Sequence, residues 1–192
     1  MNISRQEAGA ALDSIHDAGA TVHQHRSYGY AAPYLILWGS IWAACNTVSQ
    51  FWPQRSALAW IVANVVGTAA TAWLVVNTVV HERRRCSDSA EGRSLGRRFS
   101  LLGTTLFCYF VAMFLVLAPM TGRRLGAFIS LFWTLAYMAA GAWIGRRLFI
   151  IGLIGTIGIV SSFLFAGAYF PLAMALFGGG TLIAGGLWLR KL

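Results

Sequence analysis

His81–Ser100 (HERRRCSDSAEGRSLGRRFS) is the stretch around which the rest of the chain is arranged. It contains six arginines, and long apolar runs flank it on both sides. In membrane proteins, arginine and lysine gather beside the ends of spanning helices, chiefly on the cytoplasmic side. This stretch therefore predicts a basic cytoplasmic loop, residues 81–98, between two transmembrane helices, and it sets the orientation of the helices around it.

The composition of the whole chain indicates a lipid environment. Of the 192 residues, 57% are hydrophobic and 11% are charged, whereas a soluble domain has about 25% charged residues. A chain with so few charges cannot cover a water-facing surface. The net charge of +9 would suggest a nucleic-acid partner in a soluble protein. Here the arginines lie at the ends of apolar runs, so we expect no nucleic acid.

The apolar residues form blocks of about 20 residues, the length of an α-helix that crosses a bilayer. We therefore predict an all-α integral membrane protein, a bundle of six transmembrane helices with both termini in the cytoplasm. Residues 1–32 are expected to form a cytoplasmic N-terminal segment with a short amphipathic helix, and residues 33–192 the membrane domain. Pro33 would open the first span, because proline is tolerated at a helix start. The predicted spans are residues 33–52, 57–80, 99–120, 125–144, 148–170 and 171–189.

The distribution of charge predicts which side of the membrane each end occupies. With six spans, both termini and the basic loop share one side, which holds 12 of the 15 lysines and arginines. The positive-inside rule places that side in the cytoplasm. Arg123 and Arg124 lie on the opposite side and oppose this bias, so they are candidates for an anionic-lipid or ligand contact. We expect a multi-pass protein of a bacterial inner membrane.

The interiors of the predicted spans contain no Asp, Glu, His, Lys or Arg. Proton-coupled transport typically uses ionisable groups within the membrane, and hydrolysis needs a base or a metal ion. We therefore predict a non-enzymatic protein with no catalytic residue, no cofactor and no metal site.

Polar and aromatic residues inside the spans are the candidate site residues. On the second and fourth spans the polar residues are spaced i, i+4, i+7, so each set occupies one face of its helix. Such faces either hold helices together by hydrogen bonds or line a cavity for a small ligand, and both interpretations stay open. Two tryptophans near mid-depth could wall a site for a flat or apolar ligand, or simply pack. The candidates are Asn46, Asn64, Thr68, Thr71, Ser130, Thr134, Tyr137, Trp42 and Trp133.

The expected partners are the lipid bilayer, a soluble cytoplasmic protein and a second copy of the chain. Glycines in the last spans, and Gly141 with Gly145, favour tight helix packing or a homo-oligomer, and Gly178–Gly180 is a candidate kink. Our first hypothesis is a sensor, regulatory or accessory subunit that contacts its partner through residues 1–30 and the basic loop. The alternative is a small carrier or channel-like protein for a neutral or hydrophobic solute. Candidate lipid or partner contacts are Arg83, Arg84, Arg85, Arg97 and Arg98.

Overall fold

A computed structural model describes residues 5–83, 90–117 and 122–191, and in these ranges the chain is helical with short connections and no strand. Side chains are described for residues 27–78, 101–117 and 122–191 except Trp143. The elements are α1 (Arg5–Phe51), η1 (Pro53–Arg55), α2 (Ser56–Arg83), α3 (Ala90–Leu117), α4 (Gly122–Ile144), α5 (Arg146–Phe165), η2 (Gly167–Tyr169), α6 (Phe170–Met174), η3 (Ala175–Gly179) and α7 (Gly180–Arg190).

Four segments are long and apolar enough to cross a membrane: Pro53–Thr78, Gly122–Ala142, Arg146–Phe165 and Gly167–Arg190. They correspond to the second, fourth, fifth and sixth predicted spans. The third predicted span contains a shorter apolar helix, Leu101–Leu117, and the first lies within α1. The prediction of an all-helical chain with helices of membrane-spanning length and composition is thus confirmed. The number six remains a prediction.

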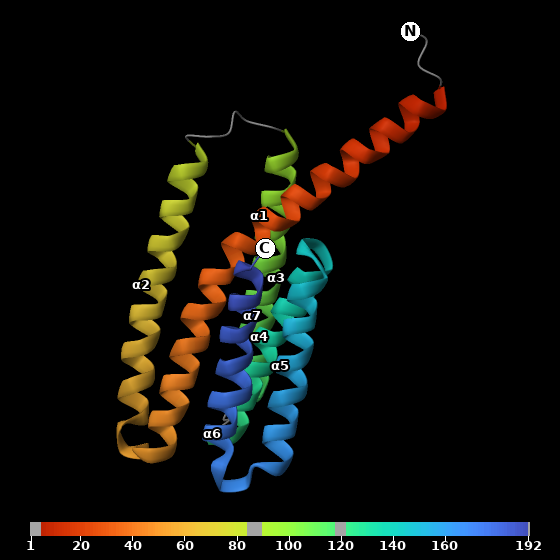
Figure 1. Ribbon diagram of the computed structural model, residues 1–192. Helices are drawn as coiled ribbons and strands as arrows, with labels where there is room; N and C mark the ends of the chain where they lie inside the picture. Colours follow the sequence, from red (N-terminus) through yellow and green to blue (C-terminus); the bar gives the residue numbers. More distant parts are fainter. Residues whose placement is uncertain (1–4, 84–89, 118–121, 192) are drawn as a thin grey trace.

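The core of the bundle lies among α1, α4, α5 and the α6–α7 segment, which Figure 1 shows side by side. One cluster of buried side chains joins α1, α5 and α7: Tyr28, Ala32, Leu35, Leu148, Ile151, Leu182 and Leu189. A second joins α4, α5 and α6: Ala127, Ile159, Phe170 and Met174. The N-terminal part of α1 extends beyond the bundle, at the same end as the C-terminus (Figure 1).

Glycines allow α1 and the α6–α7 segment to approach closely. A Cβ atom added to Gly39 would lie 2.9 Å from the carbonyl oxygen of Gly179, and one added to Gly179 would lie 2.7 Å from the amide nitrogen of Ala43. One turn before the end of α7, a Cβ atom added to Gly186 would lie 2.9 Å from the carbonyl oxygen of Ala32. The two backbones therefore touch at positions where only glycine fits, as is common between membrane helices.

The outer helices α2 and α3 lie at the edges of this core. α2 packs on α1, where Gly67 meets the ring of Trp38. α3 packs on α4, where the ring centroid of Phe110 lies 5.9 Å from that of Phe128 and 4.8 Å from that of Phe132. Most large apolar side chains of both helices are exposed. Such surfaces suit contact with lipid tails, which are as apolar as the side chains themselves.

The first helix does not begin at Pro33, contrary to the prediction. α1 runs without interruption from Arg5 to Phe51, with Pro33 inside it. A proline within a helix lacks an amide hydrogen, so the carbonyl of Gly29 loses its usual donor. Tertiary packing holds the helix together, because Ala32 and Leu35 on either side of the proline are 0% and 2% exposed. The N-terminal segment is therefore continuous with the helix of the first predicted span.

The last predicted span is interrupted by the π-helical turn η3 between α6 and α7. Gly178 and Gly179 lie in this turn, and Gly180 is the first residue of α7. The helix thus departs from α-geometry at the position where the sequence predicts a kink. Turns of this kind are rare, and they occur frequently at functional sites.

Candidate functional site

A cavity lies between α1, α4, α5 and the η3–α7 segment. Its volume is about 60 Å³. One water molecule needs about 10–15 Å³ of such space, so the cavity has room for a small ligand. Its lining consists of Trp38 and Trp42 from α1, Ser130, Trp133, Thr134 and Tyr137 from α4, Gly155 and Ile159 from α5, Gly178 from η3, and Thr181 and Leu182 from α7.

Trp38 and Trp42 form the α1 wall, one helical turn apart, and α2 holds them in place. Trp38 donates its indole N–H to the hydroxyl of Thr71 over 3.1 Å. The ring of Trp42 meets Trp60 edge-on, with centroids 5.8 Å apart and an angle of 86° between the planes. α2 therefore orients this wall from behind, although the described lining includes no α2 residue.

The opposite wall is one face of α4, with residues at i, i+3, i+4 and i+7: Ser130, Trp133, Thr134 and Tyr137. Two of its hydroxyls donate to backbone carbonyls of the same helix. Ser130 donates to Gly126 over 2.6 Å, and Thr134 donates to Leu131 over 3.0 Å. Trp133 lines the cavity and is also 50% exposed. Trp133 therefore lies between the cavity and the outer surface of the bundle.

Small residues set the floor of the cavity. A Cβ atom added to Gly155 would lie 2.9 Å from the methyl carbon of Thr134, so α5 approaches α4 closely there. The hydroxyls of Thr156 and Thr134 lie 2.9 Å apart and link the same two helices. On the other side, a Cβ atom added to Gly178 would lie 3.7 Å from the ring of Trp42. The π-helical turn η3 is thus in contact with the α1 wall.

The cavity combines aromatic walls with hydrogen-bonding groups that have no partner. The described lining carries no charged side chain. Four of its polar groups make no hydrogen bond to any described residue: the indole N–H groups of Trp42 and Trp133 and the hydroxyls of Tyr137 and Thr181. An indole N–H can only donate, whereas a hydroxyl can donate or accept. The site therefore offers two groups that can only donate and two hydroxyls that can donate or accept, in uncharged surroundings.

This arrangement suits noncovalent binding. The described lining has no carboxylate, imidazole, amine or thiol, the groups that most often act as general acids, bases or nucleophiles. Apolar and aromatic walls with a few well-placed polar groups are typical of small-molecule sites, including those between helices of a bundle.

Five of the nine predicted site residues line this cavity: Trp42, Ser130, Trp133, Thr134 and Tyr137. The other four lie elsewhere. Asn46 donates to the carbonyl of Trp42, 2.9 Å away in its own helix, and the exposed Asn64 does the same to Trp60 at 2.8 Å. Thr68 is exposed, and Thr71 accepts from the indole behind the α1 wall. The polar face of α2 and that of α4 therefore do not share one cavity.

Six lining residues were not among the predicted site residues: Trp38, Gly155, Ile159, Gly178, Thr181 and Leu182. Trp38 carries a usable signal, because it lies one turn before Trp42 on the same helix face. The contributions of α5 and η3–α7 have no such signal. A glycine or a leucine that lines a cavity has the same sequence pattern as one that packs against a helix.

Two further predictions concern surfaces. Arg84 and Arg85 lie outside the described residues, as do the side chains of Arg83, Arg97 and Arg98, so the proposed lipid or partner contact stays a prediction. The homo-oligomer through glycine-rich helices also stays a prediction. Several of those glycines contact other helices of the same chain: Gly141 faces Phe149, Gly152 faces Met138, Gly158 faces Phe177 and Gly185 faces Ile151.

No protein-family model, no curated protein and no solved structure matches this chain.

Proposed function

We propose that the chain is a non-enzymatic polytopic membrane protein that binds a small neutral ligand in this cavity and serves as a sensor or as a regulatory or accessory subunit. The observation that supports this most strongly is the cavity itself, with aromatic walls from two helices and a described lining free of charge. An ion bound there would lose its hydration without gaining a charged partner, which is costly. A neutral molecule has no such penalty.

α1 connects the cavity to the end of the bundle where a soluble partner would bind. Trp38 and Trp42 lie on this helix, which continues past them to Arg5 and beyond the bundle (Figure 1). Its 47 residues correspond to about 70 Å of α-helix. A ligand that packs against these tryptophans acts on the same helix that forms the N-terminal segment. We place the partner contact on residues 1–30 and the basic loop, residues 81–98.

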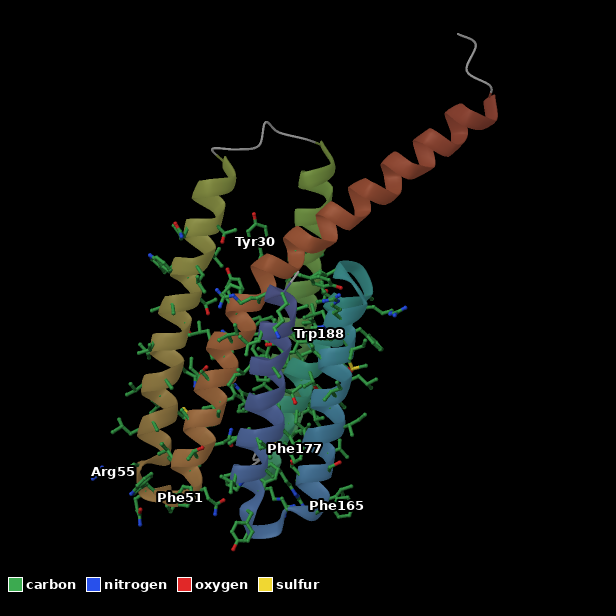
Figure 2. All side chains as sticks on the ribbon, viewed as in Figure 1. Tyr30, Phe51, Arg55, Phe165, Phe177 and Trp188 are labelled. Carbon is green, nitrogen blue, oxygen red and sulfur yellow. The ribbon has the colours of Figure 1, made fainter. Side chains whose placement is uncertain are left out.

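The proposed setting is a bacterial inner membrane that the chain crosses six times, with both termini in the cytoplasm. The uneven distribution of lysine and arginine, 12 of 15 on one side, supports this orientation. The arrangement of the helices is compatible with it. Tyr30 and Trp188 lie toward the end where α1 leaves the bundle, and Phe51, Arg55 and Phe165 lie at the other end (Figure 2).

Ligand binding is tested with the protein in lipid nanodiscs and with 1-indanone, a flat neutral molecule, as the probe. Saturation-transfer NMR against empty nanodiscs should detect specific binding. Thr181→Phe should abolish it by filling the cavity, whereas Thr68→Phe, at an exposed position outside the cavity, should not. Thermal unfolding of both variants shows whether they are folded. Absence of binding to the wild-type protein, or binding that survives in a folded Thr181→Phe variant, would contradict the proposal.

A small carrier for a neutral solute is the second candidate, and the π-helical turn at the cavity favours it. Such turns mark places where a helix departs from regular geometry, often at functional sites. Proteoliposomes loaded with radiolabelled glycerol or glucose distinguish the two functions. Exchange above the protein-free level that Thr181→Phe blocks would indicate a carrier. A soluble protein that binds the full chain but not a variant without residues 1–30 would indicate a regulatory subunit.

A further inference from the structure

The polar groups of the cavity divide into those that are already bonded and those that are available to a ligand. The indole N–H of Trp38 is bonded to Thr71. The hydroxyls of Ser130 and Thr134 donate to carbonyls of their own helix. Each of these groups has a single proton, so none of them can donate to a ligand without breaking its present bond.

The available groups are the indole N–H of Trp42, the indole N–H of Trp133, and the hydroxyls of Tyr137 and Thr181. None of them is bonded to a described residue. Two of the four can only donate, and the other two can do so by rotating their hydroxyl. Among the described residues only Gln50 Oε1 is a buried side-chain polar atom without a hydrogen-bond partner, so these four groups are accessible to a small molecule. The two indole N–H groups can bond only to an acceptor, which favours a ligand that brings one.

The walls of the cavity select for shape. Trp38 and Trp42 on α1 face the α4 wall, which includes Trp133 and Tyr137. Aromatic rings pack best against other flat groups, by offset stacking or edge-to-face contact. Aromatic walls also attract cations, so a small organic cation is the competing ligand. It would bring no acceptor to the two indole N–H groups.

From the available donors and the uncharged aromatic walls, we infer that the ligand is a flat, neutral molecule with a carbonyl or similar acceptor oxygen, of the class of aromatic ketones, aldehydes and esters. This inference rests on the proposed function, because it specifies the ligand of the same cavity. The carbonyl oxygen accepts from one of the available N–H or O–H groups, and the ring lies between the α1 and α4 walls. The half-exposed Trp133 brings the cavity close to the outer surface of the bundle, which suits a molecule that partitions into the lipid.

The inference is tested with three probes that share one bicyclic skeleton. 1-Indanone has a carbonyl oxygen, indane has a methylene group in its place, and 1-aminoindane carries a positive charge at neutral pH. Affinities for the protein in nanodiscs are corrected for partition into empty nanodiscs. We expect 1-indanone to bind about threefold to tenfold more tightly than indane, as one net hydrogen bond would give. 1-Aminoindane should bind more weakly than 1-indanone.

Variants that remove one available donor show which group binds the carbonyl. Tyr137→Phe, Trp133→Phe, Trp42→Phe and Thr181→Val each remove a hydroxyl or an indole N–H, and at least one should bring the indanone-to-indane affinity ratio close to one. The control is Trp38→Phe, which should leave the ratio unchanged because that N–H is already bonded to Thr71. Using the ratio cancels changes in packing that affect both probes.

The outcomes separate this inference from the proposed function. If indane and 1-indanone bind equally, if 1-aminoindane binds most tightly, or if the ratio stays the same in all four variants that remove an available donor, the inferred ligand class is wrong and the binding site remains. If none of the three probes binds, both the inference and the proposed function are overturned.

Discussion

Gly179 and Gly180 are neighbours with opposite surroundings, and this pair tests helix packing at the scale of single residues. A Cβ atom at Gly179 would lie 2.7 Å from the amide nitrogen of Ala43, whereas nothing lies within 4 Å of one at Gly180. Gly179→Ala should therefore lower the free energy of unfolding by about 1–3 kcal/mol, because α1 and η3 must move apart. Gly180→Ala should leave it unchanged or raise it by up to about 1 kcal/mol, because alanine favours a helix.

Unfolding of both variants in mixed micelles, followed by circular dichroism against the fraction of denaturing detergent, measures these differences. The two substitutions add the same methyl group to adjacent residues, so each serves as the control for the other. Equal effects would show that α1 does not contact η3 at this point.

Single residues also show what the sequence can predict about the site. Ser130, Thr134 and Tyr137 share a helix face by their spacing alone, and that face lines the cavity. Asn64 and Thr68 share a face by the same rule, yet both are exposed. Periodicity identifies residues on one face of a helix, but it does not say which helix that face meets. The neighbour depends on close approaches between residues far apart in the chain.

The attachment of α3 is a prediction at the scale of elements. Phe110 lies against Phe128 and Phe132 of α4, whereas Phe107 on the same helix is 67% exposed. Phe110→Ala should lower the free energy of unfolding by about 1–3 kcal/mol, the sum of two aromatic contacts. Phe107→Ala should change it by less than about 0.5 kcal/mol, as exposed positions usually do. The same unfolding measurement compares the pair, and a larger loss for Phe107→Ala would mean that Phe107 rather than Phe110 makes the main contact of α3 with the bundle.

The observed helix boundaries agree with the predicted ones where local residue preferences determine them, and they differ where contacts between helices determine them. Gly122 and Gly145 have φ angles of 54° and 143°, conformations that favour glycine, and a helix begins at or directly after each. Pro33 is a local signal of the same kind, yet α1 passes through it because Ala32 and Leu35 are buried against other helices. No local sequence pattern predicts this packing between helices.

The distribution of charge between the two ends of the bundle concerns the molecule as a whole, and Arg123 is one of the three arginines on the side with few basic residues. Its guanidinium lies 4.9 Å from the ring centroid of Phe163 and 5.2 Å from that of Phe170, and it donates to the carbonyl of Phe163. At another helix junction, Arg147 lies 5.0 Å from the ring centroid of Trp188. Contacts of this kind stabilise a guanidinium within the protein, so Arg123 has a structural role that is independent of the orientation of the chain.

The orientation itself gives the last prediction. Alkaline phosphatase is active only outside the cytoplasm, so in bacterial cells it should be silent when fused after Leu192 and active when inserted after Gln54. The reason is the excess of lysine and arginine on the side of the termini, 12 of 15. A cytoplasmic fluorescent reporter at the same two sites is the reciprocal control. If alkaline phosphatase is active after Leu192 and silent after Gln54, the bundle has the opposite orientation, and an odd number of helices still crosses the membrane between the two sites. If the enzyme is active at both sites, an even number of helices crosses the membrane between them. The helix that does not cross would then be α3, because its apolar segment, Leu101–Leu117, is the shortest.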